Sequence, residues 1–219
     1  VGGYLAGAVP RNGLNARQML AQPRKAYVLL GAEPELDAFD SAQAEAAMKQ
    51  AEFVVALSAY QHHALDYAHA LLPIAPFTET SGTFVNTEGR AQSFSGVVLP
   101  LAETRPAWKV LRVLGNLAGL AGFDYDSSEA VRKDALGDGS IAPRVDNALS
   151  SKPQGGTDAP VAGVQRIGEV SIYQTDAVVR RAAALQKTRD GGQPVATLAG
   201  VLYDKLGLRD GDSVRIAMG

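Results

Sequence analysis

The sequence predicts an α/β protein with a Rossmann-like, mostly parallel sheet flanked by helices, followed by the first strands of a β-barrel domain. Two short apolar runs, 26–30 and 53–57, are typical of strands buried on both faces. The segment between them, 41–51, is rich in Ala, Glu, Met, Lys and Gln and has strong helix propensity. A strand, a helix and a second strand at this spacing indicate a βαβ unit.

The elements around this unit follow from local signals. A short helix is expected over 15–21, stopped by Pro23. Asp40, with Gln43 three residues later, can cap the 41–51 helix. A further short helix is expected over 63–70, and a third extended segment over 70–74 ends at prolines.

Residues 78–92 are mostly polar and lie between two apolar runs. The first run ends with residues 73–76, and the second run is 97–99. Gly82 and Gly89 alternate here with Thr, Ser and Asn, whose side chains can hydrogen-bond the local backbone. We therefore expect an ordered polar loop, without a strand partner, between two buried elements. Ordered loops on rigid scaffolds often carry function.

Two helices are expected after this loop. Thr104 resembles an N-cap, with Pro106 in the first turn of a helix that has one apolar stripe. The stripe comprises Trp108, Leu111, Leu114 or Gly115, and Ala118. Asp126 and Ser127, with Glu129, are expected to start a second helix, which ends at Gly137.

The segment 138–163 is rich in glycine, proline, serine and aspartate and is predicted to link a domain at 1–137 to a second segment at 164–219. In the second segment we expect extended chain over 164–173, a helix over 176–185 and another over 199–206. A tight turn over 209–212 should lead into a strand over 213–217. That segment would be an incomplete β-barrel.

Composition excludes several classes of function. The net charge is −2 with the two signs interspersed, which gives no reason to expect nucleic acid or an anionic membrane as partner. There is no cysteine, so this chain forms no disulfide and supplies no thiolate to an iron–sulfur cluster. No apolar run reaches the roughly 20 residues that span a bilayer. The first residue is Val1 and not Met, so we expect a piece of a longer protein.

The remaining candidate sites are weak. His62, His63 and His69 lack the converging third or fourth ligand that zinc requires, and we expect them to be partly exposed. The Gly-x-Gly-x-x-Gly fingerprint is absent, so NAD binding is not expected. Glu79 is expected to accept backbone N–H bonds. We find no nucleophile–base constellation.

Residues 82–92, Gly-Thr-Phe-Val-Asn-Thr-Glu-Gly-Arg-Ala-Gln, closely resemble the Gly-Thr-Phe-x-Asn-x-Glu-Gly-Arg-x-Gln signature of the molybdopterin oxidoreductase superfamily. More narrowly, they resemble the large iron–sulfur subunit (the G chain) of bacterial NADH-quinone oxidoreductase, respiratory complex I. Segments 2–10, 26–34 and 173–181 are similar to the same subunit. The resemblance therefore covers most of the chain.

The resemblance implies a vestigial pterin-site loop and no catalytic or metal-binding residue in this chain. In pterin-binding members the loop packs near the cofactor, whereas the complex I subunit keeps the fold and lacks the pterin. Arg90 would then form a structural ion pair with Glu88 or Glu79. The loop residues are Gly82, Thr83, Asn86, Glu88, Gly89 and Arg90.

Two positions depart from the pterin pattern. His69 follows Ala68 where the family often has aspartate, and Glu33 precedes Pro34 where the superfamily often has asparagine. Glu33 follows the first strand, at the edge where doubly wound sheets bind ligands, and a carboxylate there would repel a phosphate-bearing cofactor. We therefore expect no cofactor in this chain, and iron–sulfur clusters in the full subunit.

By resemblance, the chain is a non-catalytic scaffold in an assembly that passes electrons from NADH through iron–sulfur clusters to quinone, coupled to proton translocation. Its expected partners are the remainder of the G subunit and the other peripheral-arm subunits, on the cytoplasmic side of the bacterial inner membrane. Neither nucleic-acid binding nor membrane insertion is expected. The unpaired strand at 213–217 could produce an artefactual dimer.

Two alternatives remain open. One is a molybdopterin-dinucleotide-binding domain of a formate-dehydrogenase or nitrate-reductase type oxidoreductase. The other is a free-standing nucleotide-binding module.

Overall fold

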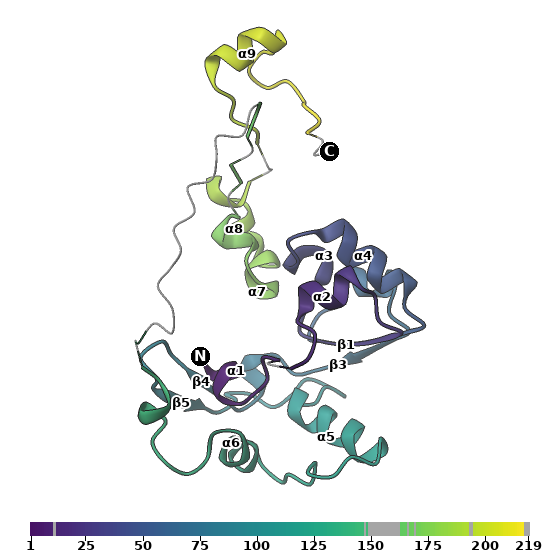
Figure 1. Ribbon diagram of the computed structural model, residues 1–219, viewed down its shortest axis with the longest axis vertical. Helices are drawn as coiled ribbons and strands as arrows, with labels where there is room; N and C mark the ends of the chain where they lie inside the picture. The colour runs from purple at the N-terminus through teal and green to yellow at the C-terminus, as the bar shows by residue number, and fades with distance from the viewer. Residues whose placement is uncertain are drawn as a thin grey trace. The chain divides into compact units, whose positions relative to one another are not determined.

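The computed structural model describes residues 1–10, 12–146, 148, 163–165, 167–168, 170–192 and 195–216. Most of the second half of the predicted linker lies outside these ranges. The chain divides into two compact units, 1–160 and 161–219, and each is treated by itself. The first unit contains α1 (Gly2–Leu5), α2 (Ala16–Ala21), β1 (Ala26–Leu30), α3 (Pro34–Asp37), α4 (Ser41–Gln50), β2 (Phe53–Ser58), η1 (His63–Asp66), β3 (Ala70–Pro73), η2 (Phe77–Glu79), β4 (Gly82–Val85), β5 (Ala91–Phe94), α5 (Ala107–Leu117), α6 (Ser128–Leu136) and η3 (Ala142–Arg144) (Figure 1).

The predicted α/β class is confirmed by a three-stranded parallel sheet in the order β1-β2-β3. Helix α4, the longer of the two helices between β1 and β2, starts as expected. The Asp40 side chain accepts a hydrogen bond from the Gln43 N–H at 2.9 Å. Asn15 and Gln18 form a reciprocal capping box at the start of α2. The predicted helix over 63–70 is shorter than expected, a 3-10 turn that ends before β3 begins.

The core lies between the sheet and the helices on one of its faces. The strand register places Tyr27 beside Val54 on this face, where Met48 of α4 is also fully buried. The Tyr27 hydroxyl donates to the Met19 carbonyl at 2.8 Å, which fixes α2 to the strand. Figure 1 shows α2, α3 and α4 on this side of the sheet and α5 on the other.

The other face of the sheet is only partly covered, so the expectation that β1 is buried on both faces is wrong. Val28 and Leu30 are 61% and 49% exposed, and Phe53 is 49% exposed. Leu57 on the next strand is 1% exposed. Val28 and Leu30 lie on β1, an edge strand, and Phe53 begins β2 beside Ala26 of β1, whereas Leu57 lies near the other end of β2, beside Leu72 of β3.

The expected polar loop is instead a β-hairpin. Strands β4 and β5 pair antiparallel, with Gly82 opposite Phe94 and Val85 opposite Ala91. Asn86 closes the turn, because its Oδ1 accepts from the N–H of Glu88 at 3.1 Å and of Arg90 at 2.9 Å. The apolar run 97–99 is also not a buried element, since its three side chains are between 58% and 90% exposed.

Helix α5 begins later than predicted and α6 begins as predicted. Thr104 is not the N-cap of α5: its Oγ1 donates to the Leu101 carbonyl at 2.6 Å, and Pro106 occupies the cap position without a side-chain bond. The Ser127 hydroxyl accepts from the Ala130 N–H at 3.1 Å at the start of α6. Gly137, at φ +80°, ends that helix.

The second unit contains short helical elements and, within its described residues, no β-strand. The predicted helix over 176–185 breaks in two near Arg181. The predicted strand over 213–217 is absent over 213–216, because an isolated strand has no partner for its backbone groups. The elements are η4 (Ile172–Gln174), α7 (Ala177–Arg180), α8 (Ala183–Gln186), η5 (Arg189–Gly191) and α9 (Gly200–Leu206).

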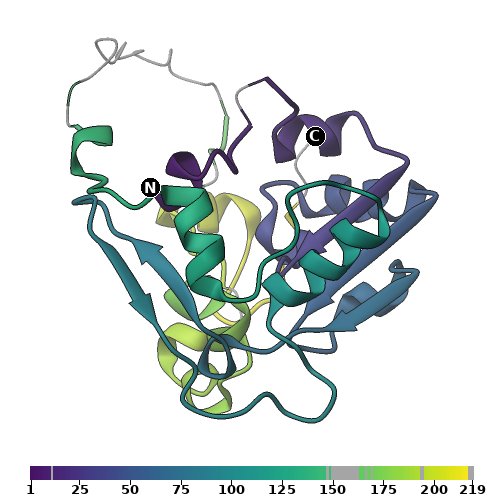
Figure 2. The same ribbon diagram turned by 90° about the horizontal axis from the view of Figure 1, so that it is seen from below.

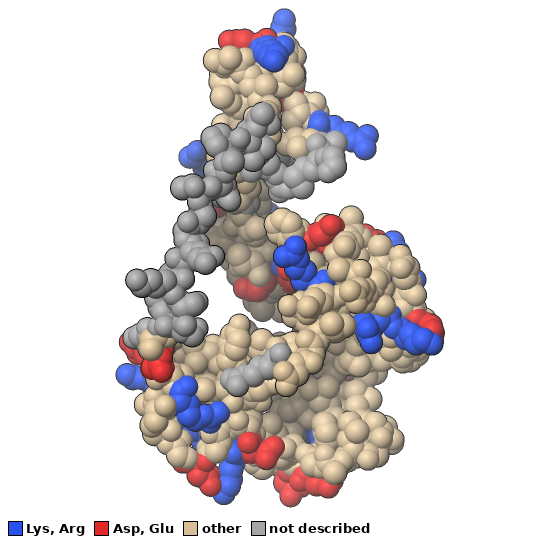
Figure 3. All heavy atoms as spheres, in the orientation of Figure 1, with Lys and Arg blue, Asp and Glu red and all other residues tan. Residues whose placement is uncertain are grey.

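Basic and acidic side chains are intermingled on the face shown in Figure 3, as expected from the interspersed charges of the sequence. Within the described parts of the chain, no helix is both long enough and apolar enough to cross a bilayer.

Candidate functional site

The structure divides the six predicted loop residues between a strand and a turn. Gly82 and Thr83 lie in β4, whereas the other four lie at or beside the hairpin turn. The Arg90 guanidinium approaches Glu88 at 4.0 Å, with the two side chains 70% and 73% exposed. An exposed pair of this kind contributes little to stability. The other predicted partner, Glu79, instead accepts from the Leu101 N–H at 2.9 Å.

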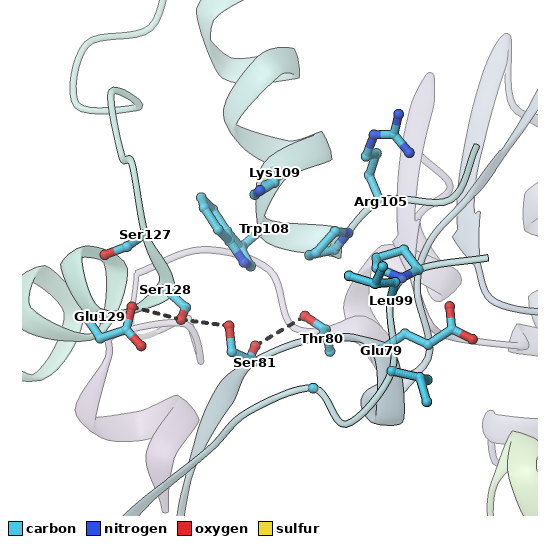
Figure 4. Close-up of a pocket in the computed structure, with 14 residues that line it drawn as sticks. Glu79, Thr80, Ser81, Leu99, Arg105, Trp108, Lys109, Ser127, Ser128 and Glu129 are labelled. Carbon is cyan, nitrogen blue, oxygen red and sulfur yellow. Dashed lines mark hydrogen bonds between the residues drawn. The ribbon is translucent and has the colours of Figure 1, made fainter. Parts of the chain in front are cut away.

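Two hollows flank the base of this hairpin, and they share Ser81, Trp108 and Ser128 as a common wall. The first has a volume of about 520 Å³ and is drawn in Figure 4. Its lining is Glu79, Thr80, Ser81, Gly96, Val98, Leu99, Pro100, Arg105, Pro106, Trp108, Lys109, Ser127, Ser128 and Glu129. The second, of about 480 Å³, lies between β4, α6 and the N-terminal residues.

A chain of hydroxyl groups crosses the shared wall (Figure 4). The Ser81 hydroxyl donates to the Ser128 hydroxyl at 2.7 Å, which donates in turn to a Glu129 carboxylate oxygen at 3.2 Å. Hydrogen bonds from the backbone N–H of Glu129 itself, and then from Ser127 and Ser128, lower the pKa of the Glu129 carboxyl group. The N-terminus of α6 therefore already holds an anion of its own.

Trp108 contributes an unused donor to this wall. Its Nε1 is buried and has no hydrogen-bond partner among the described residues. Figure 4 shows the nitrogen side of the indole directed toward Thr80 and Ser81. The Lys109 ammonium lies 5.4 Å from the centroid of the indole ring. An acceptor atom placed here would satisfy a donor that the fold leaves unpaired.

A second polar cluster lies where β1 and β2 end, at the carboxyl edge of the parallel sheet. Glu33 is 2% exposed, and the Glu35 side chain is 11% exposed. The Tyr67 hydroxyl donates to Glu35 Oε2 at 2.9 Å. His62 Nδ1 accepts from the Ala64 N–H at 3.2 Å and lies 3.5 Å from Glu35 Oε1.

The expectation of partly exposed histidines fails for His62, whose side chain is only 3% exposed. Its burial results from its position as the N-cap of η1, where the imidazole bonds the backbone. His63 is 74% exposed beside Asp66, as expected. Within the described ranges, no three histidine, aspartate or glutamate side chains converge as metal ligands would.

Replacing Tyr67 by phenylalanine should destabilise the first unit by about 1.5–3 kcal/mol at pH 7, since a bond to a charged acceptor is lost. Burial, followed by the hydrogen bond to Glu35, raises the pKa of the Tyr67 phenol above its ordinary value of 10.0. This contribution is therefore fully present below pH 10 and is lost as the pH rises further. Urea unfolding at pH 7 and above pH 10 measures the difference in unfolding free energy between the wild type and Tyr67→Phe, which should be smaller at the higher pH.

The matched control is Tyr4→Phe, because Tyr4 is 68% exposed. If the wild type and Tyr67→Phe unfold with the same midpoint at pH 7, the hydroxyl bond does not stabilise the fold.

Several residues of these two clusters were not predicted as site residues. Trp108 was expected only as part of an apolar stripe, and Ser127 only as a helix cap. The pairing of Glu35 with Tyr67 joins residues 32 positions apart and leaves no local signal in the sequence. Glu33 was singled out because it lies three residues after the end of β1, at the ligand-binding edge, and His62 and Glu79 were also weighed as candidates.

The domain belongs to the α/β class with a parallel sheet, a class in which ligands bind at the carboxyl edge of the strands. Residues 1–117 match the Molybdopterin oxidoreductase family, and the chain belongs to that family. It is 31% identical over 111 residues to "Probable oxidoreductase YjgC" of Bacillus subtilis (strain 168), covering 51% of this chain and 11% of that protein. It is 33% identical over 82 residues to "Putative formate dehydrogenase SAUSA300_2258" of Staphylococcus aureus (strain USA300), covering 37% of this chain and 8% of that protein.

The chain thus spans about a tenth of the length of the curated relatives that it matches.

Proposed function

We propose that this chain is a non-catalytic scaffold portion of the large iron–sulfur (G) subunit of bacterial complex I. The parent assembly transfers electrons from NADH through iron–sulfur clusters to quinone and couples this to proton translocation. The observation that carries the proposal is the buried Glu33 carboxyl group at the carboxyl edge of the sheet. Together with the signature over 82–92, it supports a family member that keeps the fold without the pterin.

The carboxyl edge is where an open α/β sheet binds its ligand. Here three acidic residues, Glu33, Glu35 and Asp37, lie within five positions of one another. A pterin dinucleotide carries phosphate charge, and two like unit charges 4 Å apart repel by about 4 kcal/mol at an effective dielectric constant of 20. This set of side chains does not fit such a cofactor. Because the chain has no cysteine, cluster ligands would come from elsewhere in the parent.

The same proposal specifies partners and location. The chain would contact the remainder of the G subunit and other peripheral-arm subunits, on the cytoplasmic side of the inner membrane. The small share of the matched relatives that it spans supports its being one part of a larger protein. The partly bare second face of the sheet supports a contact with such a neighbour, because parallel sheets are normally covered on both faces.

A second candidate is the molybdopterin-dinucleotide domain of a formate-dehydrogenase type enzyme. The specific observation in its favour is that relatives 33% identical to this chain carry the name formate dehydrogenase. In that case the cofactor would have to bind at the carboxyl edge of the sheet despite the repulsion between its phosphate groups and the Glu33 carboxylate.

The test is to purify the intact parent protein through an affinity tag and to measure its iron and molybdenum. We expect several iron atoms per polypeptide, no molybdenum, and co-purification with other electron-transfer subunits. Stoichiometric molybdenum would instead favour the formate-dehydrogenase type. A parent with neither metal would contradict both candidates.

A further inference from the structure

We propose that a groove along the outer edge of β4 binds an extended segment of a partner protein, which carries a carboxylate and adds to β4 as a further strand. The groove, called here the β4 groove, is the 480 Å³ hollow introduced above. Its lining comprises Val1, Gly2, Gly3, Ala6, Ser81, Gly82, Thr83, Phe84, Val85, Trp108, Ser128, Val131, Arg132, Ala135 and Leu136. The proposal concerns surface recognition and does not depend on the proposed scaffold function.

The groove follows a strand edge, because five consecutive residues, 81–85, line it. Among the strands of the described residues, β4 pairs with β5 alone. Asn86 and Arg90 form a hydrogen-bonded pair, with the Asn86 N–H donating to the Arg90 carbonyl at 3.2 Å. Bonded and non-bonded pairs alternate along an antiparallel ladder, so Thr83 and Val85 belong to non-bonded pairs.

The main-chain N–H and C=O groups of residues in non-bonded pairs point away from the partner strand. Thr83 and Val85 therefore present them to the outer edge of β4. Within the described residues, neither N–H group has another backbone or side-chain acceptor. An exposed edge of this kind is a template for an added strand.

The opposite wall is one face of α6. Its lining residues 128, 131, 132, 135 and 136 have the three- and four-residue spacing of a single helix face. Figure 2 shows α6 lying alongside the hairpin, with the short helix α1 next to it. Val131, Ala135 and Leu136 make this wall apolar, so an inserted strand would find hydrogen bonds on one side and apolar contacts on the other.

The preference for a carboxylate follows from the polar groups in the groove. Among the described residues that line it, Arg132 has the only charged side chain, and it makes no ion pair or side-chain hydrogen bond with the described part of the chain. The buried Nε1–H of Trp108, in the wall shared with the neighbouring hollow, is also without an acceptor there. A cationic side chain and an unpaired donor favour an anionic group that accepts hydrogen bonds.

One end of the edge is partly closed by α1. A Cβ atom built on Gly2 would lie 3.4 Å from Cγ2 of Val85, so α1 packs directly against that end of β4. The accessible part of the edge is therefore near Ser81 and Thr83. This length suits a short extended segment of a few residues.

The test uses the full chain and a labelled synthetic peptide of alternating Val and Thr ending in Glu, with binding measured by fluorescence anisotropy. We expect saturable binding. The same peptide with alternate backbone nitrogens methylated should not bind, because methylation removes the donors needed for strand pairing. Arg132→Gln should weaken binding of the Glu peptide about fivefold and leave a Gln-ended peptide unaffected.

Thr83→Pro provides an independent variant, since it removes an outward N–H and keeps the bonds between β4 and β5. It should abolish binding. The proposal is overturned if the methylated peptide binds equally well or if Thr83→Pro, still folded, binds as the wild type does. Should Thr83→Pro fail to fold, the methylated peptide still decides.

Two further outcomes overturn the assignment to a separate partner. If the chain alone self-associates in sedimentation experiments and the peptide disperses it, the occupant is a second copy. If the intact parent protein does not bind the peptide although this chain does, a segment of the parent fills the groove.

Discussion

Replacing Gly89 by valine should destabilise the first unit by about 2–6 kcal/mol, more than any other single change in the hairpin. Gly89 has φ +78°, a conformation that a β-branched residue adopts only at a cost of about 1–3 kcal/mol. A Cβ atom at this position would also lie 2.5 Å from Cγ2 of Val145. Overpacking of this kind adds about 1–3 kcal/mol.

Two other substitutions in the hairpin should each destabilise the first unit less than Gly89→Val does. Gly82→Val avoids the backbone penalty, because Gly82 has no positive φ, and collides only with the Phe94 ring, 2.7 Å from the new Cβ. Asn86→Ala removes the two backbone hydrogen bonds that its Oδ1 accepts and a longer one to Glu88 at an exposed turn, which together are worth about 1–2 kcal/mol. Thermal and urea unfolding should therefore rank Gly89→Val as the most destabilising.

The double variant Gly89→Val with Val145→Ala separates the two causes. It should recover the steric part of the loss and leave the backbone part, since the two sites are in contact and their effects are not additive. If Asn86→Ala is the most destabilising of the three single variants, side chains and not backbone geometry hold this turn.

The parts of the fold that the sequence predicted are those fixed by local interactions. Asp40 caps α4 and Ser127 caps α6 through bonds that span three residues, so the residue types alone predict them. The hairpin was missed because its strands consist mainly of small and polar residues. Its pairing depends on contacts such as the Thr83–Ser93 hydroxyl bond, across ten positions, and on Phe84 stacking against Phe94.

The candidate site shows the same division. Glu33 was predictable as a residue at the ligand-binding edge because it lies three residues after the end of an apolar strand. That His62 is buried depends on α3 folding back over η1, which joins segments far apart in the sequence. The shared wall of the two hollows depends on Ser81 meeting Ser128 across 47 positions, a contact set by tertiary packing alone.

Burial was the least predictable property, because it depends on neighbours outside each segment. The run 26–30 has the composition of a doubly buried strand, yet it lies at one edge of a three-stranded sheet. An apolar run indicates what a strand can bury, whereas the layers around the sheet decide what it does bury.

Gly115→Ala in α5 should destabilise the first unit by about 1–3 kcal/mol, although the change alone favours the helix. Alanine is better than glycine in a helix interior by about 1 kcal/mol. Gly115 is buried, however, and a Cβ atom there would overlap the Phe123 ring, including Cγ at its base. The whole ring would have to move, so the cost of overpacking exceeds the gain in propensity.

The matched control is Gly200→Ala in α9, where a Cβ atom would meet nothing within 4 Å. That change should leave stability unchanged or raise it slightly. The variant Gly115→Ala with Phe123→Ala should remove the overlap, so that in urea unfolding the added methyl group stabilises the chain relative to Phe123→Ala alone. If Gly115→Ala by itself stabilises the chain, the Phe123 ring does not rest on α5, and the turn after this helix packs in another way.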